Sequence, residues 1–428
     1  MIVRKGRHAV RYSERVQSVA RCLVRVASVP VVIAVLGCAA GEDGVVPTGT
    51  EVLRASRVLD GQGGVLDNRD VVVRGGRIVE IVPAGQGRGD RVHDLAGLTL
   101  MPGMIDTHVH TGWYFDADGR LARGGDAAER VMHTAENAYR MLEAGFTTVQ
   151  SLGGPEDAPV RDALARGVLP GPRILTSLGS ITEGTGDAEA IRAAVRDFAA
   201  RGADLIKIFG SESIRTGGAP TLSQDQIGAA CGEAAALGLR AVVHAHGPES
   251  ARRASLAGCT TIEHGALLDR ATLEYLAEQG TFYDPNIHLI FQNYFDNESR
   301  YVGIGSYTAD GFAQMRAAVP RALEAFRLAL DVPGLKTVFG TDAVAGAHGR
   351  NAEELVYRVR VGGQDPMDAV VSITSLAAES LWLGDELGSV VPGMSADLIA
   401  VDGDPATEIE AVLRVRWVMK DGRVVVHP

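Results

Sequence analysis

The chain is poor in aromatic residues and cysteines, and it carries no excess of positive charge. Aromatic residues make up 5% of the 428 residues, and the formal net charge is -11. This acidic balance argues against nucleic acid as a partner, because neutralising phosphates requires clustered Lys and Arg. With 46% hydrophobic residues and 52 glycines, the composition is instead typical of a large core whose regular elements are joined by many tight connections.

Cysteine is scarce enough to exclude a disulfide framework. Of the four cysteines, only Cys231 and Cys259 lie after residue 50, and two cysteines do not build a disulfide-stapled fold. Both stand in apolar surroundings, which favours buried free thiols. A bond between them stays open for an exported protein.

The N-terminal segment lacks an apolar run long enough to span a bilayer comfortably. Residues 1–37 contain seven basic residues and one acid, and the apolar run at 26–37 has twelve residues, which matches a secretory signal. The run ends in Leu-Gly-Cys38-Ala-Ala, which resembles a bacterial lipobox. We therefore expect a lipoprotein-type signal peptide over residues 1–37, lipidation of Cys38, and a polar tether over residues 38–50.

Such a protein would be exported and held by its lipid on the extracytoplasmic face of a bacterial envelope, with no other membrane contact. The alternative is an uncleaved apolar N-terminus with an incidental cysteine. The sequence does not define the oligomeric state.

Both ends of the folded body show short strands in which apolar and polar residues alternate. Turn signals such as Gly75-Gly76 and Asp421-Gly422 separate them. We therefore predict one small β-sandwich assembled from residues 51–100 and 388–428. Its strands are expected at residues 51–59, 70–74, 77–82, 397–401, 414–420 and 423–426.

The middle of the chain, residues 101–387, alternates short apolar strands with helical stretches, which is typical of a parallel α/β fold. Eight candidate strands indicate a (β/α)8 barrel, or TIM barrel, in which catalytic groups lie at the carboxyl ends of the strands. The strands are expected at residues 103–110, 147–152, 173–177, 205–210, 241–246, 261–265, 281–286 and 337–342.

Helical patterns fill the connections between these strands. Ser223 is a plausible N-cap with Gln226 as its capping-box partner. Residues 288–319 are too long for a plain connection, and we expect them to cover the barrel mouth. Other helices are expected at residues 188–201, 223–237 and 249–257.

Two histidines one residue apart end the first barrel strand. Residues i and i+2 of a strand point to the same side, so His108 and His110 can converge on one metal ion. A lysine in a buried strand is costly to desolvate, so Lys207 needs a partner or a modification. Further ligand-type side chains end other strands, namely His244, His246, His264 and Asp342.

These positions belong to motifs that resemble the amidohydrolase superfamily, in its imidazolonepropionase-like and Xaa-Pro dipeptidase-like group. The resemblance covers nearly all of the chain after residue 50 and implies a metal-dependent hydrolase on a TIM barrel. The motifs are Pro-Gly-Met-Ile-Asp-Thr-His-Val-His at 102–110, Ile-Lys-Ile at 206–208, His-Ala-His-Gly at 244–247, Ile-Glu-His-Gly at 262–265, Gly-Thr-Asp-Ala at 340–343 and Val-Pro-Gly-Met-Ser-Ala-Asp-Leu at 391–398.

The resemblance implies a site with two divalent metal ions. Carboxylation of Lys207 by carbon dioxide would turn a costly buried cation into an anionic ligand that bridges the ions, and nitrogen and oxygen ligands with open positions fit Zn²⁺. The two ions would share a hydroxide nucleophile, and Asp342 would be the catalytic proton shuttle. The alternative is an unmodified Lys207 paired with an acid beside a single metal. The implied ligands are His108, His110 and Asp342 for one ion and His244 and His264 for the other.

Substrate contacts are predicted from position alone. His246, Tyr283 and His348 are expected to face the barrel mouth and bind substrate, and the alternative for each is a packed or solvated side chain. His288 is expected to face the mouth as well, and Glu263 is expected to be structural. An aromatic wall that suits an apolar acyl group is expected from Trp113, Tyr114 and Phe115.

The predicted reaction is hydrolysis of C–N amide bonds in small substrates, either dipeptides or N-acyl amino acids. Relatives often carry an Arg-Asp pair at the end of the second strand, whereas this chain has Gln150-Ser151, which weakens the case for recognition of a C-terminal carboxylate there. Two other hypotheses stay open: a single-metal hydrolase of cyclic amides or imidazolones, or a deaminase, and an exported lipoprotein that binds without catalysis. The intact ligand set argues against the last.

Overall fold

The structure is a computed structural model that describes residues 49–122 and 124–427. The predicted signal peptide, Cys38 and most of the predicted tether lie outside these residues and stay predictions. Within the described residues, no helix combines the length and the apolar character that crossing a membrane would require.

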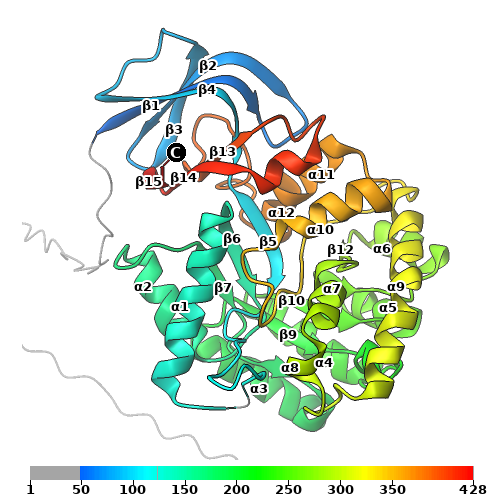
Figure 1. Ribbon diagram of the computed structural model, residues 1–428. Helices are drawn as coiled ribbons and strands as arrows, with labels where there is room; N and C mark the ends of the chain where they lie inside the picture. The colour runs from blue at the N-terminus through cyan, green and yellow to red at the C-terminus, as the bar shows by residue number, and fades with distance from the viewer. Residues whose placement is uncertain (1–48, 123, 428) are drawn as a thin grey trace, which may run out of the picture. The chain divides into compact units, whose positions relative to one another are not determined.

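Alternating apolar residues from both ends of the chain pair in one seven-stranded sheet (Figure 1). The two ends meet where β4 pairs with β13, with Leu100 opposite Ala400. The β1–β4 pair is parallel, and the remaining pairs are antiparallel. In spatial order the strands are β15 (Arg423–Val426), β14 (Val415–Lys420), β13 (Leu398–Asp402), β4 (Arg91–Pro102), β1 (Thr50–Leu59), β2 (Val65–Arg74) and β3 (Arg77–Pro83).

This sheet has an apolar core of its own. Leu53, Val71, Leu398 and Trp417 belong to it and are fully buried. Residues two apart on a strand share a face, so the alternating pattern brings these side chains together. Hydrogen bonds join these seven strands in a single sheet. A sandwich consists of two packed sheets, and strand pairing alone does not show such packing, so the sandwich stays a prediction.

Near-continuous apolar runs in the middle of the chain form two parallel sheets, which confirms the predicted parallel α/β fold. Strands buried on both faces read as such runs, and every residue of β5, β6 and β10 is buried. The smaller sheet has the order β5 (Met104–Val109), β6 (Phe146–Ser151) and β7 (Arg173–Thr176). The larger has the order β12 (Phe282–Asp284), β11 (Thr261–His264), β10 (Arg240–Ala245), β9 (Leu205–Phe209) and β8 (Ser180–Ile181).

The predicted strand at residues 337–342 does not form a ladder in the described chain. Isolated parallel bridges join Thr337 to Tyr283 and Ala343 to Val109, so the segment runs between β12 and β5. Asp342 has a φ of 53°, which is incompatible with extended strand geometry. The apolar pattern predicts the position of this segment but not the break in its backbone.

Helices alternate with the parallel strands along the chain (Figure 1). The predicted capping box is confirmed, because the Gln226 N–H donates to Ser223 Oγ and the Ser223 N–H donates to the Gln226 side chain. The helices are α1 (Ala127–Glu143), α2 (Asp157–Ala165), α3 (Ala188–Ala200), α4 (Gln224–Ala236), α5 (Pro248–Leu256), α6 (Arg270–Gln279), α7 (Leu289–Asp296), α8 (Glu298–Tyr301), α9 (Ala309–Leu330), α10 (Ala352–Tyr357), α11 (Pro366–Ile373) and α12 (Ser375–Ser380).

Cys231 and Cys259 form a disulfide, which corrects the expectation of two free thiols. Cys231 lies on α4, and Cys259 follows α5, the helix that packs beside α4. This packing brings the two Cα atoms to 5.3 Å, within the range that a disulfide spans. Apolar surroundings alone could not predict the bond, because it depends on how the two helices pack.

Candidate metal centre and active site

One cavity of about 230 Å³ collects all the residues predicted to hold metal. It lies where β5, β9, β10 and β11 end, and the carboxyl ends of parallel strands meet at one edge of a sheet. We refer to it as the histidine cavity. Its lining includes His108, His110, Lys207, His244, His246, His264 and Asp342.

Asp342 lies against the two histidines of the first strand. Its Oδ1 is 3.1 Å from Nε2 of His110 and 3.4 Å from Nε2 of His108. The backbone maintains this arrangement, because the Asp342 N–H donates to the His108 carbonyl at 2.7 Å. One ligand atom from each of His108, His264 and Asp342 lies within 4.8 Å of the other two. These atoms are close enough to approach a common metal ion.

His244, His246 and His264 contribute three further imidazoles to the cavity. The ring centroids of His244 and His264 are 4.5 Å apart, and His246 stacks on His264 at 5.0 Å. Nδ1 of His246 is buried without a hydrogen-bond partner in the described chain. Three imidazoles from β10, β11 and the residue after β10 therefore face one space.

Burial favours the neutral form of three of the predicted ligand histidines. It lowers the pKa of His108, His244 and His264 well below the ordinary value, and the charge of Lys207 lowers each pKa further. Burial acts in the opposite direction on Asp342, but attraction by His108 and the hydrogen bond from His110 outweigh it and leave the pKa of Asp342 below its ordinary value. Neutral imidazole and ionised carboxylate are the forms that bind metal.

Lys207 is 1% exposed, and its Nζ has no hydrogen-bond partner among the residues that the structure describes. Burial lowers the pKa of Lys207, although the negative charges of Glu263, Asp342 and Asp284 act to raise it. The ring centroid of Phe209 lies 5.4 Å from Nζ. An ammonium buried in this way is costly unless an anionic group reaches it.

Glu263 orients His108 from behind the cavity. Its Oε2 lies 2.7 Å from Nδ1 of His108, and both side chains are buried. Burial raises the pKa of Glu263 to about 7. A partner at Nδ1 fixes the imidazole orientation and leaves Nε2 for the cavity, as the outer partners of metal-bound histidines do. The predicted structural role of Glu263 thus becomes specific: it positions a ligand.

Two of the predicted ligands have a left-handed backbone, since φ is 68° at His264 and 53° at Asp342. Residues other than glycine rarely adopt this conformation, and they do so mostly where the surroundings enforce it. Asp106 enforces it next to Asp342, because its carboxylate accepts hydrogen bonds from the N–H (3.1 Å) and the hydroxyl (2.7 Å) of Thr341. The side chains of His264 and Asp342 both line the cavity.

Of the three predicted substrate contacts, His246 alone is in the described lining. Tyr283 is fully buried, and its hydroxyl donates to the His264 carbonyl at 3.4 Å. Nε2 of His348 lies 3.1 Å from the His110 carbonyl, behind that residue. Tyr283 and His348 therefore lie outside the described lining, each against a backbone carbonyl of a predicted ligand residue, and not at the predicted position at the mouth.

Of the three residues predicted to form an aromatic wall, one lines the cavity. Trp113 lines the cavity, whereas Tyr114 and Phe115 pack against other rings outside the lining. His288 also lies outside, stacked on Tyr357 with the centroids 4.1 Å apart. Its predicted position at the mouth is corrected in the same way.

Sequence reasoning missed a cation and two tyrosines in the lining. Arg215 lies on a short 3-10 helix, η2 (Ile214–Thr216), in the loop after β9. Tyr294 and Tyr307 come from residues 288–319, which agrees with the predicted cover over the mouth. The place of Arg215 just after a strand end was a usable signal, because the loops at that end of parallel strands bind ligands.

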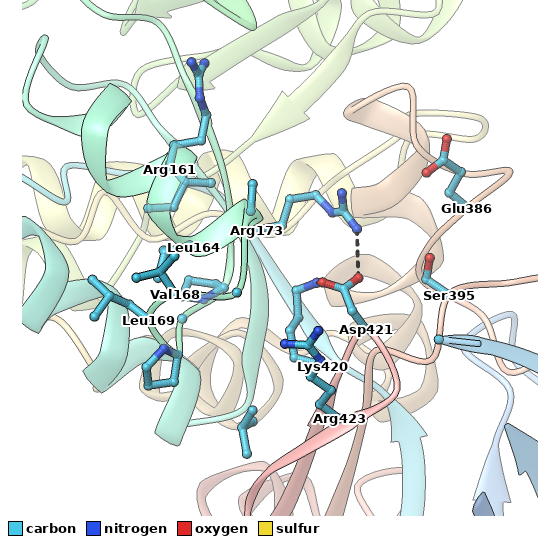
Figure 2. A pocket seen from close by; sticks show the side chains of 18 of the residues that line it. Arg161, Leu164, Val168, Leu169, Arg173, Glu386, Ser395, Lys420, Asp421 and Arg423 are labelled. Carbon is cyan, nitrogen blue, oxygen red and sulfur yellow. Dashed lines mark hydrogen bonds and ion pairs between the residues drawn. The ribbon is translucent and has the colours of Figure 1, made fainter. Parts of the chain in front are cut away.

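A second cavity, of about 630 Å³, lies between the α2–β7 connection and the seven-stranded sheet (Figure 2). We refer to it as the sheet cavity. Nη2 of Arg173 lies 3.3 Å from Asp421, and Nζ of Lys420 lies 2.5 Å from Asp421 and 3.3 Å from Asp397. Its described lining contains no residue that was predicted to hold metal or to bind substrate.

Comparisons with known proteins agree with this geometry. The sequence model of the amidohydrolase family matches residues 99–425. The ochratoxinase of Aspergillus niger is 26% identical over 376 residues, which cover 77% of this chain and 76% of that protein. A crystal structure of a Xaa-Pro dipeptidase with bound methionine in the active site superposes with a TM-score of 0.80 at 29% identity, over 88% of this chain and 100% of the other. The imidazolonepropionase of Salmonella schwarzengrund is 47% identical over 99 residues, 23% of this chain and 20% of that protein.

Proposed function

Since the chain belongs to the amidohydrolase family and is a hydrolase of C–N bonds, we propose that it cleaves the amide bonds of dipeptides or N-acyl amino acids in the histidine cavity, with two divalent metal ions as cofactors. The observation that carries the proposal is the buried Lys207, whose Nζ has no hydrogen-bond partner among the described residues. It shares its cavity with five histidines and one aspartate. A structural lysine would have a carboxylate beside it.

We infer that the two parallel sheets belong to one closed (β/α)8 barrel. The bridges of residues 337 and 343 to β12 and β5 connect the sheets on one side. The ligands cluster at the carboxyl ends of the strands, as they do in barrel enzymes.

The donor set fits two divalent ions. His108, His110 and Asp342 would hold one, and His244 and His264 would hold the other. Lys207 in carboxylated form would bridge them, because carboxylation would place an anionic oxygen ligand on the very nitrogen that lacks a partner. Imidazole and carboxylate ligands with open positions suit Zn²⁺. When bound, the ions would activate water and polarise the scissile carbonyl.

Asp342 would take the proton from the attacking water and pass it to the leaving amine. Its position supports this role, since its carboxylate lies on the cavity wall within 3.1 Å of His110 and its backbone is fixed by the bond to His108. His246 would contact substrate through Nδ1, which has no hydrogen-bond partner within residues 49–122 and 124–427.

The lining supports an apolar substrate group beside the reacting bond. Apolar side chains make up part of the lining and would exclude water from the part of the substrate that they contact. The similarity to a Xaa-Pro dipeptidase supports a dipeptide among the candidates. The apolar walls are Trp113, Ile290, Phe291, Met315 and Val344.

We also propose that the protein is exported and lipidated at Cys38. The disulfide between Cys231 and Cys259 supports export, because structural disulfides persist in oxidising compartments. Labelling of cells with a fatty-acid probe tests the anchor: the wild-type protein is expected to incorporate it and Cys38→Ser is not. Equal labelling of both would refute the assignment.

Purified protein loaded with zinc tests the proposed reaction. We expect two ions per chain, a carbamate signal from isotope-labelled bicarbonate, and hydrolysis of members of a dipeptide and N-acyl amino acid panel. Asp342→Asn should lower turnover about 1,000-fold or more. One ion per chain without a carbamate signal would favour a single-metal hydrolase, and hydrolysis of no panel member would refute the proposed substrates.

A further inference from the structure

Arg215 is the cation of the histidine cavity that metal binding would not use. It lines the cavity beside Ser213 and Ile214, in the loop that follows β9. The described lining contains one lysine, Lys207, and one arginine, Arg215. Because Lys207 would be a metal ligand, Arg215 is available for a different anion.

The protein orients the Arg215 guanidinium without neutralising it. Nε donates to Ser306 Oγ at 3.0 Å. Cζ lies 4.2 Å from the ring centroid of Tyr307 and 5.6 Å from that of Tyr294. Aromatic faces stabilise a cation by their quadrupole but leave its full charge, and the bond at Nε fixes the plane of the fork. The result is a charged group prepared for a partner.

That partner is missing among the described residues, where no carboxylate forms an ion pair with Arg215. The buried Arg358 shows the contrast, since Glu354 lies 3.2 Å and Asp284 lies 3.6 Å from its guanidinium nitrogens. Protein interiors normally pair a buried charge in this way. An arginine that is positioned, partly buried and unpaired in a cavity is suited to a carboxylate, which matches its planar fork.

We propose that Arg215 binds the free carboxylate of the substrate and restricts the enzyme to amides that carry one. The inference rests on the proposed function and names the substrate class: N-acyl amino acids and dipeptides with an apolar side chain. No arginine from β6 could take this role, because that strand supplies Gln150, whose side chain donates to the Thr107 carbonyl at 2.7 Å outside the cavity lining.

Paired substrates test the proposal on the zinc-loaded protein. The best-hydrolysed panel member is compared with its C-terminal carboxamide, which has the same shape and no charge. Wild type should prefer the carboxylate. Arg215→Met should lower kcat/KM for the carboxylate about 100-fold and change kcat/KM for the carboxamide by less than about threefold, with Arg215→Lys between the two. Arg300→Met is the matched control, because Arg300 also lies over a ring, that of Phe115, but outside the lining.

Equal losses on both substrates would assign Arg215 to structure and overturn the proposal, as would a wild type that does not discriminate. Binding of leucine and leucinamide, measured by calorimetry, tests carboxylate recognition without any turnover. It therefore distinguishes failure of this inference from failure of the proposed reaction. Leucine should bind wild type more tightly than leucinamide does, and Arg215→Met should abolish the difference even if no panel member is hydrolysed. Absence of carboxylate-dependent binding in wild type would overturn the assignment.

Discussion

The histidine cavity and the sheet cavity each contain a buried lysine, and the two lysines have opposite surroundings. Lys420 in the sheet cavity is 8% exposed and pairs with Asp397 and Asp421. Lys207 in the histidine cavity is 1% exposed, and within the described chain its Nζ has no hydrogen-bond partner. The arginines repeat this contrast, since Arg173 faces Asp421 in one cavity and Arg215 faces aromatic rings in the other.

The two cavities differ in whether their buried lysine is paired, and cavity volume does not follow that difference. The sheet cavity is the larger, at about 630 Å³ against about 230 Å³, yet its buried lysine is paired with carboxylates of the protein. A charge that is paired within the fold contributes to stability, whereas a positioned charge without a partner is left for a ligand. The two lysines should therefore respond to substitution in opposite ways.

Lys207→Met should have the largest effect, and it should fall on activity. Removing the bridging ligand should lower kcat/KM about 1,000-fold or more and reduce the zinc that remains after dialysis. The metal-free variant should be at least as stable as the metal-free wild type, because a buried ammonium without a partner destabilises the fold. Urea unfolding and metal analysis measure the two effects. A variant with full metal content and full activity would contradict the bridging role.

Lys420→Met should show the reverse pattern. The change leaves the buried Asp397 carboxylate without its cation, which we expect to lower the free energy of unfolding by about 2 kcal/mol. The sheet cavity lies apart from the predicted ligands, so kcat/KM should stay within about twofold of wild type. Urea unfolding measures the free energy of unfolding, and a standard activity assay measures kcat/KM. A large loss of activity with unchanged stability would remove the distinction between the two cavities.

The convergence of the candidate ligands in one place could be predicted from the strand pattern of the sequence, whereas the ligand set itself was implied by the family resemblance and stays a prediction. Alternation along a strand places His108 and His110 on one side, and parallel strands bring Lys207, His244 and His264 to one edge. Each of these residues lines the cavity in the structure. The alternation of apolar strands with helical stretches predicted the parallel sheets, and the Ser223–Gln226 spacing predicted the capping box.

The features that sequence reasoning missed depend on how loops and helices pack. Arg215 lies on a loop whose course no periodicity describes, and Tyr283 turned inward to a backbone carbonyl. The disulfide required knowing that α4 and α5 lie side by side. Residues 337–342 read as a strand, but hydrogen bonds from Thr341 to Asp106 hold a left-handed residue at Asp342.

Glu263→Leu should weaken metal binding by about 10- to 100-fold. The change removes the acceptor 2.7 Å from Nδ1 of His108, so the imidazole loses the contact that aims Nε2 at the metal. Glu263→Gln should lose less, because an amide oxygen can still accept that hydrogen bond. Competition with a zinc chelator measures the affinities, and equal affinity of Glu263→Leu and wild type would show that His108 is oriented by other contacts.

Arg173→Met should have the smallest effect. The guanidinium of Arg173 is about one-third exposed and the Asp421 carboxylate is 60% exposed, so water already screens their attraction. Exposed pairs of this kind contribute about 1 kcal/mol or less. Unfolding in urea at low and high salt should give nearly the same small difference from wild type, and kcat/KM should be unchanged. A loss of several kcal/mol would mean that Arg173 carries a paired charge as tightly as Lys420 does, and that the sheet cavity depends on this ion pair for its shape.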